Sequence, residues 1–380
     1  MIQSKLPNVG TTIFSVMSKM AVEQNALNLS QGFPDFPVSE ELISLISEAM
    51  KSGKNQYAPM PGLPLLREQI AEKILKTGGR RIDPDTEITI TAGATEALFA
   101  TIISIIKTDE EVIVLEPTYD SYIPAIQLAG GIPVPIPLNQ PDFSINWEVI
   151  EQKVTDKTRL LLINSPHNPS GSIISKGDIE RLIKVLDKNP NLLVLSDEVY
   201  EHLIFDEQQH QSVLNYPTIA DRCIAVYSFG KTFHATGWKT GYVVASPAIS
   251  AEIRKVHQYL TFSVHTPSQF GIAEYLRNAN NYLSLPAFYQ KKRDLFLKSI
   301  SGSRFKVIES KGTYFQLLDY SEITDEKDTE FAKRLVDEFR IAAIPISVFY
   351  TDQKDDKLLR FCFAKKEDTL VKAGEIIRSI

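Results

Sequence analysis

Cysteine is nearly absent from this 380-residue chain, which has only Cys223 and Cys362, in apolar runs far apart in the sequence. Two isolated cysteines give neither a disulfide framework nor a metal-binding pattern. The six histidines include no His-x-x-x-His pair and no cysteine at ligand spacing. The sequence therefore predicts no metal site, and the cysteine usage favours a reducing, cytoplasmic location.

Basic clusters and long apolar runs are also missing. The formal net charge is −6, and no local run of lysine and arginine offsets it, which disfavours nucleic acid and membrane surfaces as partners. The most apolar run, 97–106, is too short to span a bilayer, and the N-terminus lacks the apolar core of a signal peptide. With 43% hydrophobic residues, the chain can bury a large core.

Short β-branched runs recur between longer amphipathic segments. Several of these runs lack polar alternation, as expected of strands that are covered on both faces. We expect strands at 87–91, 111–115, 159–164, 192–196, 223–227 and 241–245, and helices at 95–107, 120–129 and 175–188. This alternation predicts an α/β fold with a mostly parallel sheet flanked by helices.

Two other regions depart from this alternation. In 130–138, prolines alternate with apolar residues, which predicts an edge strand instead of a linker. After about residue 270, helical segments at 268–300 and 328–339 surround shorter strand-like runs. The sequence therefore predicts a second, smaller α+β domain.

The stretch "AVYSFGKTFHATGWKTGY", residues 225–242, leaves two interpretations of Lys231. Its first part loosely fits a phosphate-binding P-loop. However, the loop positions, 226–229, continue a strand and lack the glycines that wrapping a phosphate requires. Gly237 and Gly241 would also interrupt the long helix that must follow. The other interpretation is a lysine that forms a Schiff base.

A better phosphate cradle occurs in "ITITAGATEALFA", residues 88–100. A strand runs into Gly93, Ala94 and Thr95 and then into an amphipathic helix, whose first N–H groups are free to bind an anion. An ordinary strand-to-helix turn has the same pattern, and the G-x-G-x-x-G spacing of a dinucleotide site is absent.

Polar residues follow two of the expected strands. "LLLINSPHNPSG" contains Asn164 and Asn168, and "LLVLSDEVYEH" contains Asp197 and Tyr200. Asp197 alone would fit a helix N-cap. Ligands of open α/β sheets bind outside the carboxyl ends of the strands, so the combination predicts a ligand site there.

Taken in order, these segments resemble the fold-type-I pyridoxal-phosphate aminotransferases of class I, within the methionine and kynurenine aminotransferase group. The likeness runs from "NLSQGFPDFP" through "NQYAPMPG", "EPTYDSY" and "SFGKTFHATGWKTGY" to "IPISVFY" and "LRFCFA". It implies a transaminase with a pyridoxal 5'-phosphate cofactor. It also implies an N-terminal arm with part of a small domain at 1–46, a large cofactor-binding domain at 47–275 and a small C-terminal domain at 276–380.

The resemblance assigns roles to individual residues. Lys231 would bind the cofactor aldehyde and move the substrate's Cα proton. Asp197 would pair with the pyridine nitrogen and have a lowered pKa beside that cation. The phenolic oxygen would bind Tyr200 and Asn168, and Tyr119 would stack on the ring. The expected phosphate contacts are Gly93, Ala94, Thr95, Ser228 and Lys239.

The remaining roles concern the substrate and a second subunit. Arg360 would bind the α-carboxylate with its planar fork, assisted by Asn164 and the backbone around Gly32. Tyr57 would reach the phosphate of a neighbouring subunit, which requires a homodimer. The expected aromatic wall of the substrate pocket consists of Phe33, Tyr57 and Phe349.

Three functions stay open on these grounds. The first is a ping-pong aminotransferase that moves the amino group of methionine, an aromatic amino acid or kynurenine to a 2-oxo acid. The second is a cysteine-conjugate β-lyase on the same scaffold. The third is a non-catalytic regulator, which is disfavoured because the match begins near residue 27 and leaves no room for a preceding DNA-binding domain.

Overall fold

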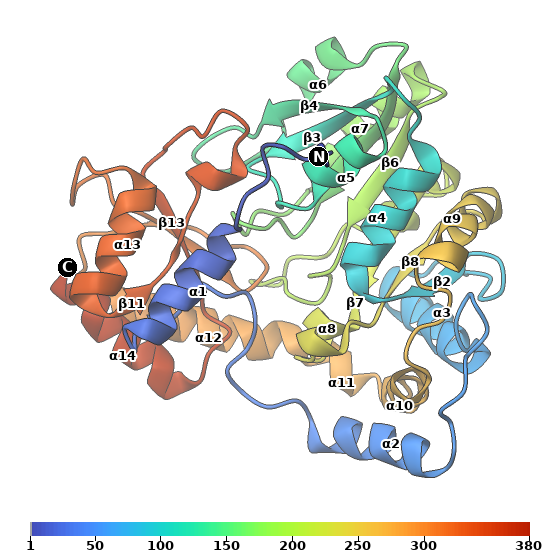
Figure 1. Ribbon diagram of the computed structural model, residues 1–380, viewed down its shortest axis with the longest axis horizontal. Coiled ribbons are helices and arrows are strands. Elements are labelled where there is room, and N and C mark those ends of the chain that lie inside the picture. Colours follow the sequence, from blue (N-terminus) through green and yellow to red (C-terminus); the bar gives the residue numbers. More distant parts are fainter. Residues whose placement is uncertain (1) are drawn as a thin grey trace.

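The computed structural model describes residues 2–380. Its centre is a seven-stranded sheet in the order β2-β8-β7-β6-β5-β3-β4 (Figure 1). β8 runs antiparallel to β2 and β7, and all other neighbours in this sheet are parallel. The strands are β2 (Ile88–Thr91), β3 (Glu111–Glu116), β4 (Ile132–Pro137), β5 (Thr158–Asn164), β6 (Leu193–Asp197), β7 (Cys223–Ser228) and β8 (Gly241–Val244). The predicted α/β fold is confirmed.

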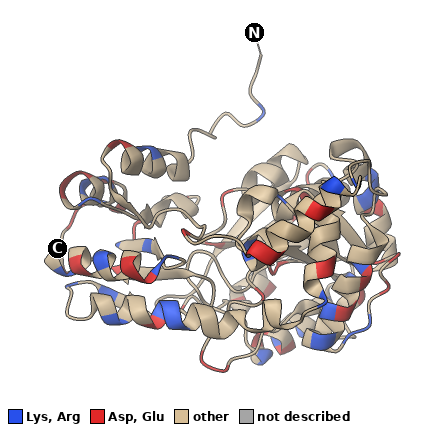
Figure 2. Ribbon diagram, turned by 90° about the horizontal axis from the view of Figure 1, so that it is seen from below, with Lys and Arg blue, Asp and Glu red and all other residues tan. Residues whose placement is uncertain are grey.

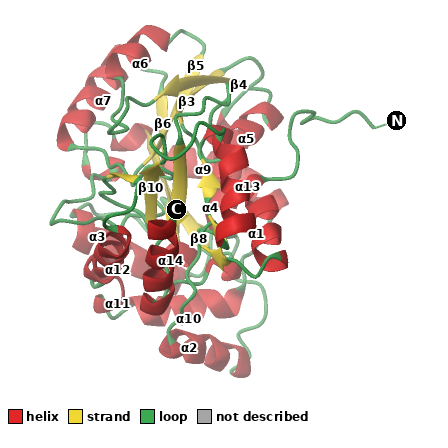
Figure 3. Cartoon of the chain, turned by 90° about the vertical axis from the view of Figure 1, so that its left-hand side faces the viewer, coloured by secondary structure: helices red, strands yellow, loops and turns green. Residues whose placement is uncertain are grey.

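Both faces of this sheet are buried by helices, as Figure 3 shows from the side. Val112 and Val114 of β3 pack in one core cluster with α4, α5 and α9, whereas Ile113 and Leu115 pack in the other with α3, α6 and α7. Side chains of a strand alternate between faces, which explains why the expected strands lack polar alternation. The helices are α3 (Pro64–Gly78), α4 (Gly93–Ile105), α5 (Tyr122–Leu128), α6 (Trp147–Lys153), α7 (Lys176–Lys188) and α9 (Pro247–Leu260).

The proline-rich strand β4 lies at the edge of the sheet, where the sequence predicted an edge strand. It pairs with β3 alone, with Pro133 opposite Val112 and Pro135 opposite Val114. Prolines have no N–H to donate. An edge strand tolerates them because one of its sides needs no partner.

A smaller four-stranded antiparallel sheet has the order β12-β13-β10-β9, and β1 pairs in parallel with β11. Figure 1 shows α1, near the N-terminus, beside α13, near the C-terminus. Both ends of the chain therefore build this region; the boundaries at residues 46 and 275 stay predictions. Its elements are α1 (Ile13–Glu23), β1 (Leu27–Asn28), β9 (Lys306–Ile308), β10 (Phe315–Asp319), α13 (Asp328–Phe339), β11 (Ile341–Ala342), β12 (Ile344–Pro345), β13 (Leu358–Cys362) and α14 (Glu367–Ser379).

The helical segment expected at 268–300 is interrupted twice. It consists of α10 (Thr266–Leu276), α11 (Asn280–Leu283) and α12 (Leu285–Ile300). The amide of Asn280 donates to the Asn278 side chain at 3.1 Å, a local bond that competes with helix continuation. Pro286 then occupies the first turn of α12, where a proline is tolerated.

The surface carries both signs of charge. Figure 2 shows lysine and arginine interspersed with aspartate and glutamate along the helices. Within residues 2–380, no helix has the length and apolar character that crossing a membrane requires. The two helices not yet given are α2 (Glu40–Lys51) and α8 (Phe229–Thr232).

Candidate active site

Three adjacent strands end in polar residues at the same edge of the large sheet. β5 ends at Asn164, β6 at Asp197 and β7 at Ser228. Asn164 lies opposite Asp197 in the strand register, and its amide nitrogen donates to the Asp197 carbonyl at 2.8 Å. The carboxyl ends of parallel strands thus place these side chains together, as expected for a ligand site in an α/β sheet.

These strand ends open into a cavity of about 250 Å³. Most of the site residues expected from the sequence line it, although they are spread over more than three hundred positions of the chain. Those lining residues are Gly32, Gly93, Ala94, Thr95, Tyr119, Asn164, Asn168, Asp197, Tyr200, Ser228, Lys231, Lys239 and Arg360.

One wall of the cavity is the N-terminus of α4. Gly93 begins this helix with a φ of 78°, a conformation that favours glycine. A side-chain carbon at Gly93 would lie 3.5 Å from Nζ of Lys239, so the ammonium group lies beside the helix start. Free N–H groups, the helix dipole and a lysine at one point are suited to bind an anion.

Close packing of β8 holds this wall in place. A side-chain carbon at Gly241 would lie 2.6 Å from the Tyr227 carbonyl oxygen, 2.9 Å from the Gly93 carbonyl carbon and 3.0 Å from the Ala94 nitrogen. All three atoms belong to the backbone, so no side-chain rotation could relieve the clash. Gly241 therefore allows β8 to touch both β7 and the first turn of α4.

Asp197 lies at the bottom of the cavity and is 4% exposed. Its Oδ2 accepts a hydrogen bond of 2.6 Å from the Tyr122 hydroxyl, and its Oδ1 accepts one of 3.3 Å from the Val199 amide. Burial raises the pKa of Asp197 to about 6, although both hydrogen bonds oppose this shift. The resemblance implied a lowered pKa for Asp197 because a cationic ring would lie beside it. The chain alone has no such ring, and in it the pKa of Asp197 is raised instead.

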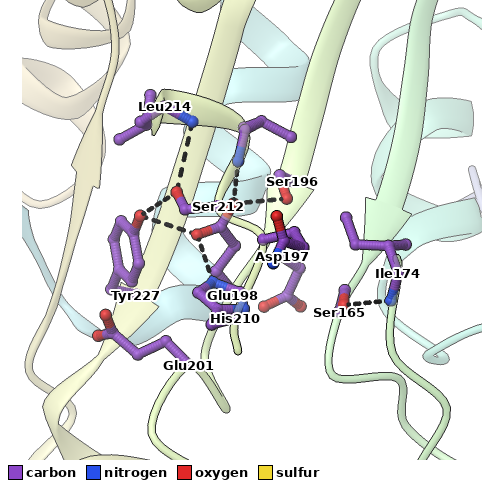
Figure 4. Close-up of polar contacts among 12 residues, drawn as sticks. Ser165, Ile174, Ser196, Asp197, Glu198, Glu201, His210, Ser212, Leu214 and Tyr227 are labelled. Carbon is purple, nitrogen blue, oxygen red and sulfur yellow. Dashed lines mark hydrogen bonds and ion pairs between the residues drawn. The ribbon is translucent and has the colours of Figure 1, made fainter. Parts of the chain in front are cut away.

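A buried network lies behind Asp197 (Figure 4). The Glu198 carboxylate accepts hydrogen bonds from Ser196 Oγ at 3.0 Å, the Val213 amide at 3.1 Å and the Tyr227 hydroxyl at 2.9 Å. It also pairs with His210 Nε2 at 2.9 Å. Burial opposes the charge on Glu198, but His210 together with hydrogen bonds such as that from the Val213 amide outweighs burial and holds the carboxyl pKa below its usual value. The network fixes the ends of β6 and β7.

Lys231 lies on α8, three residues after β7 ends at Ser228. Its Nζ donates to the Gly32 carbonyl at 3.1 Å and to the Tyr314 hydroxyl at 2.9 Å. Burial lowers the pKa of Lys231 to about 8. A buried lysine that loses its proton so readily is suited to act as a nucleophile or base.

Arg360 on β13 closes the other side of the cavity and is 1% exposed. Its guanidinium lies 3.9 Å from the centre of the Phe315 ring, donates to Asn168 Oδ1 at 2.8 Å and donates to the Ser30 carbonyl at 3.0 Å. Its Nε has no partner among residues 2–380. A buried cation with an unpaired donor is suited to bind an anionic group.

Three expected site residues do not line the cavity of the single chain. Phe349 is buried beside it, with its ring 5.8 Å from the Arg360 guanidinium. Phe33 is 44% exposed, and Tyr57 is 80% exposed. The Tyr57 ring packs only edge-on against Phe262, at 5.2 Å between ring centres. Their expected roles stay predictions.

Other lining or contacting residues were not predicted from the sequence. Tyr122 belongs to the same "EPTYDSY" motif as Tyr119, and Tyr314 and Phe315 belong to "GTYFQLLD". The resemblance includes the "EPTYDSY" motif, but which positions of either segment face the cavity depends on the fold. Phe14 of α1 also lines the cavity, with its ring 5.2 Å from the Arg360 guanidinium; no motif marks it.

The structure also decides between the two interpretations of Lys231. Residues 226–228 belong to β7, and the helix that follows has only four residues. The P-loop interpretation is therefore wrong. In the described part of the chain, no group of three or more histidine, cysteine, aspartate or glutamate side chains is placed to hold a metal ion.

Comparison with known proteins gives a consistent family. The family described as aminotransferase class I and II matches residues 24–377. The chain is 48% identical to methionine aminotransferase of Escherichia coli, over 100% of this chain and 98% of that protein. It is 32% identical to kynurenine–oxoglutarate transaminase 1 of Homo sapiens, over 95% of this chain and 93% of that protein.

Solved structures agree with these matches. A crystal structure from Escherichia coli, described as identifying a methionine aminotransferase function, has a TM-score of 0.98 and 48% identity and covers 100% of both chains. N-succinyldiaminopimelate aminotransferase of Mycobacterium tuberculosis has a TM-score of 0.95 and 35% identity, again over 100% of both chains. The fold, the match over nearly the whole length and these relatives together show that the chain belongs to the class I and II aminotransferases and is a transaminase.

Proposed function

We propose that this transaminase binds pyridoxal 5'-phosphate in the cavity between β5, β6, β7 and β13. The family depends on this cofactor, and the residues present suit its parts. The α4 N-terminus with Lys239 suits the phosphate, and the buried Asp197 carboxylate suits the protonated ring nitrogen. When bound, the cofactor supplies an aldehyde that accepts the amino group and a ring that delocalises the electron pair left at Cα.

The chain's own residues would do the remaining work. Asp197, held by Tyr122, keeps a negative charge next to the ring nitrogen. Lys231, whose pKa burial lowers to about 8, takes and returns the Cα proton. Tyr119 lines the cavity next to the cradle residue Thr95, and burial raises its pKa to about 12. It therefore stays a neutral ring that can stack on the cofactor.

We propose methionine and aromatic amino acids, including kynurenine, as amino donors, with a 2-oxo acid as acceptor in a ping-pong reaction. Within residues 2–380, Arg360 is the one arginine that lines the cavity. It suits the α-carboxylate that all donors share, which leaves no arginine for a second carboxylate. Phe14, Leu98 and Phe315 line the cavity as well and suit a flexible thioether or a flat ring.

The absence of a second arginine in this lining is the observation that carries the donor assignment. Aspartate would have to bury an unpaired carboxylate, which is costly. Steady-state kinetics of the cofactor-loaded protein should give a much higher kcat/KM for methionine and phenylalanine than for aspartate. N-succinyldiaminopimelate belongs in the same panel, because a relative is named for it. A preference for aspartate or for N-succinyldiaminopimelate, which has three carboxylates, would overturn the donor proposal.

Two variants of Arg360 test carboxylate binding in the same kinetic assay. Arg360→Ala should lower kcat/KM for every donor, by roughly 30-fold to several thousandfold, because losing one partner of a charged hydrogen-bonded pair of this kind costs roughly 2–5 kcal/mol. Arg360→Lys keeps the charge but loses the fork and should fall in between. An equal loss in both variants would mean that the charge retained by lysine contributes nothing, so that carboxylate binding depends entirely on the fork geometry of arginine.

The competing β-lyase activity uses the same residues but needs no 2-oxo acid. A β-lyase would release pyruvate and ammonia from a cysteine conjugate without any acceptor, whereas amino transfer stalls after one turnover when no 2-oxo acid is present.

We also propose a homodimer and a cytoplasmic location. The cytoplasmic location is supported by two buried free cysteines, Cys223 and Cys362.

A further inference from the structure

The amine of Lys231 is held by two oxygen atoms from distant parts of the chain. Nζ donates to the Tyr314 hydroxyl at 2.9 Å and to the Gly32 carbonyl at 3.1 Å. The Tyr314 hydroxyl itself donates to the same Gly32 carbonyl at 2.5 Å. Gly32 follows β1, and Tyr314 immediately precedes β10. A triangle of hydrogen bonds thus joins the lysine of α8 to the smaller sheet region.

The donors and acceptors in this triangle can be assigned. A tyrosine hydroxyl has one hydrogen, and the short contact places it on Gly32. The oxygen of Tyr314 must therefore accept from Lys231. A neutral amine has two N–H bonds and one lone pair, arranged tetrahedrally. Once Gly32 and Tyr314 take both N–H bonds, only the lone pair is left for the cavity that Lys231 lines.

We propose that Tyr314 is a positioning residue that, with the Gly32 carbonyl, holds the free Lys231 amine with its lone pair turned into the cavity. This inference rests on the proposed role of Lys231. It concerns the moments when the amine is free, before it captures an aldehyde and while a substrate is bound. In the capture, the lone pair forms a C–N bond to the aldehyde carbon, and the aldehyde oxygen leaves as water with the two amine hydrogens.

Packing around Tyr314 makes this position rigid. The residue is 0% exposed, and its ring lies 5.2 Å from that of Tyr200, 4.9 Å from Phe315 and 5.9 Å from Tyr289. Such a confined ring cannot swing its hydroxyl away from Nζ. The titratable or charged groups that surround the amine are Asp197, Tyr200, Lys239, Tyr314, Arg360 and Cys362.

Tyr314→Phe tests the proposal, and Tyr289→Phe is the matched control. Tyr289 is equally buried, and its hydroxyl bonds to His234 at 2.9 Å without contacting Lys231. Each variant loses one buried hydroxyl and keeps the ring. The measurement is the rate at which the cofactor-free protein captures added pyridoxal phosphate, followed by absorbance from acid to alkaline pH, with borohydride reduction and peptide mapping of the labelled lysine.

We expect two changes in Tyr314→Phe alone. The plateau rate at alkaline pH should fall roughly three- to tenfold, the value of one hydrogen bond, because the amine loses its orientation. The midpoint of the pH profile should move to lower pH, because an ammonium ion donates more strongly than an amine and so loses more when the acceptor goes. A merely structural role would alter thermal unfolding and leave the midpoint in place.

The outcomes distinguish a failure of the proposed function from a failure of the role proposed for Tyr314. If the wild-type protein captures pyridoxal phosphate at a lysine other than Lys231, the proposed function fails. If Lys231 is labelled but Tyr314→Phe matches Tyr289→Phe in plateau and midpoint, the positioning role of Tyr314 is refuted. If Tyr314→Phe does not fold, 3-fluorotyrosine at position 314 keeps the shape and weakens the acceptor, and the same two shifts are required in smaller degree.

Discussion

At the scale of single residues, the candidate site depends on how buried charges are stabilised. Asp197 carries a carboxylate whose pKa burial raises to about 6, and Tyr122 is the side chain that counteracts this shift. Lys231 shows the opposite case, since burial lowers its pKa to about 8. Both groups therefore titrate much closer to neutral pH than they would in water.

Tyr122→Phe should make cofactor binding more sensitive to acid. The variant removes the 2.6 Å donor to Asp197, so the carboxylate is less stable and its pKa rises above about 6. Binding of pyridoxal phosphate should then weaken at pH 6, by roughly 1.5–3 kcal/mol as for hydrogen bonds to charged groups. At pH 8, where a larger share of Asp197 is ionised in both proteins, the difference should be smaller.

Tyr320→Phe is the control for this titration. Tyr320 is also 0% exposed, but its hydroxyl donates to the Glu326 carbonyl and does not line the cavity. If Tyr122→Phe and Tyr320→Phe bind the cofactor with the same pH dependence, Tyr122 has no electrostatic role at Asp197.

At the scale of elements, the packing of β7, β8 and α4 determines the geometry of the candidate anion site. β8 is antiparallel to its neighbours and places Gly241 against the first turn of α4. Gly241→Ala should force this backbone apart. We expect a loss of roughly 1–3 kcal/mol in the free energy of unfolding, as for overpacking elsewhere, together with weaker binding of pyridoxal phosphate.

Gly237→Ala, four residues earlier in the same motif, offers a matched comparison. Gly237 lies in a 3₁₀ turn (Thr236–Trp238), and a side-chain carbon there would meet nothing within 4 Å. Its unfolding midpoint in urea and its cofactor affinity should stay close to those of the wild type. Equal losses in both variants would contradict the packing role given to Gly241.

The elements also show what the sequence could predict. Apolar runs without alternation identified the buried strands, and prolines identified the edge strand β4, because both patterns follow directly from burial and hydrogen bonding. The interruptions of 268–300 were missed, since a polar amphipathic pattern continues across the local bond at Asn278 and across Pro286. The antiparallel direction of β8 depends on tertiary pairing, which periodicity does not report.

Only some residues of the candidate site could likewise be predicted from the sequence. Residues at strand ends, such as Asn164 and Asp197, could be placed from the sequence because the sheet topology brings them together. Tyr122, Tyr314 and Phe14 depend on side-chain directions set by packing, and no spacing in the sequence encodes these. Tyr57 lies outside the cavity of its own chain, so its predicted role involves a second chain.

At the scale of the whole molecule, an exposed aromatic patch consists of Tyr57 and Phe262, whose rings lie 5.2 Å apart. Tyr57 is 80% and Phe262 37% exposed, and Tyr259 and Leu260, shortly before Phe262 in the sequence, are 90% and 47% exposed. Exposed aromatic clusters of this kind mark interaction surfaces. The proposed homodimer would cover the patch and bring Tyr57 to the phosphate site of the other subunit.

Subunit mixing tests this arrangement. Lys231→Ala should be inactive and Tyr57→Ala strongly weakened, but a heterodimer of the two contains one site with both wild-type residues. At equal amounts and full exchange, activity should recover to about a quarter of the wild-type level, since half of the dimers are mixed and each has one complete site. A monomer in sedimentation, or no recovery after proven exchange, would contradict the composite site.

The central claim is that Lys231 and the cofactor carry out amino transfer from methionine to a 2-oxo acid. The most direct test is the half-reaction of the yellow, cofactor-loaded protein with methionine in the absence of any acceptor. The account predicts that one equivalent of methionine bleaches the yellow band, that a 2-oxo acid restores it, and that Lys231→Ala shows no such band. Bleaching by aspartate faster than by methionine, or turnover that continues without an acceptor, would contradict it.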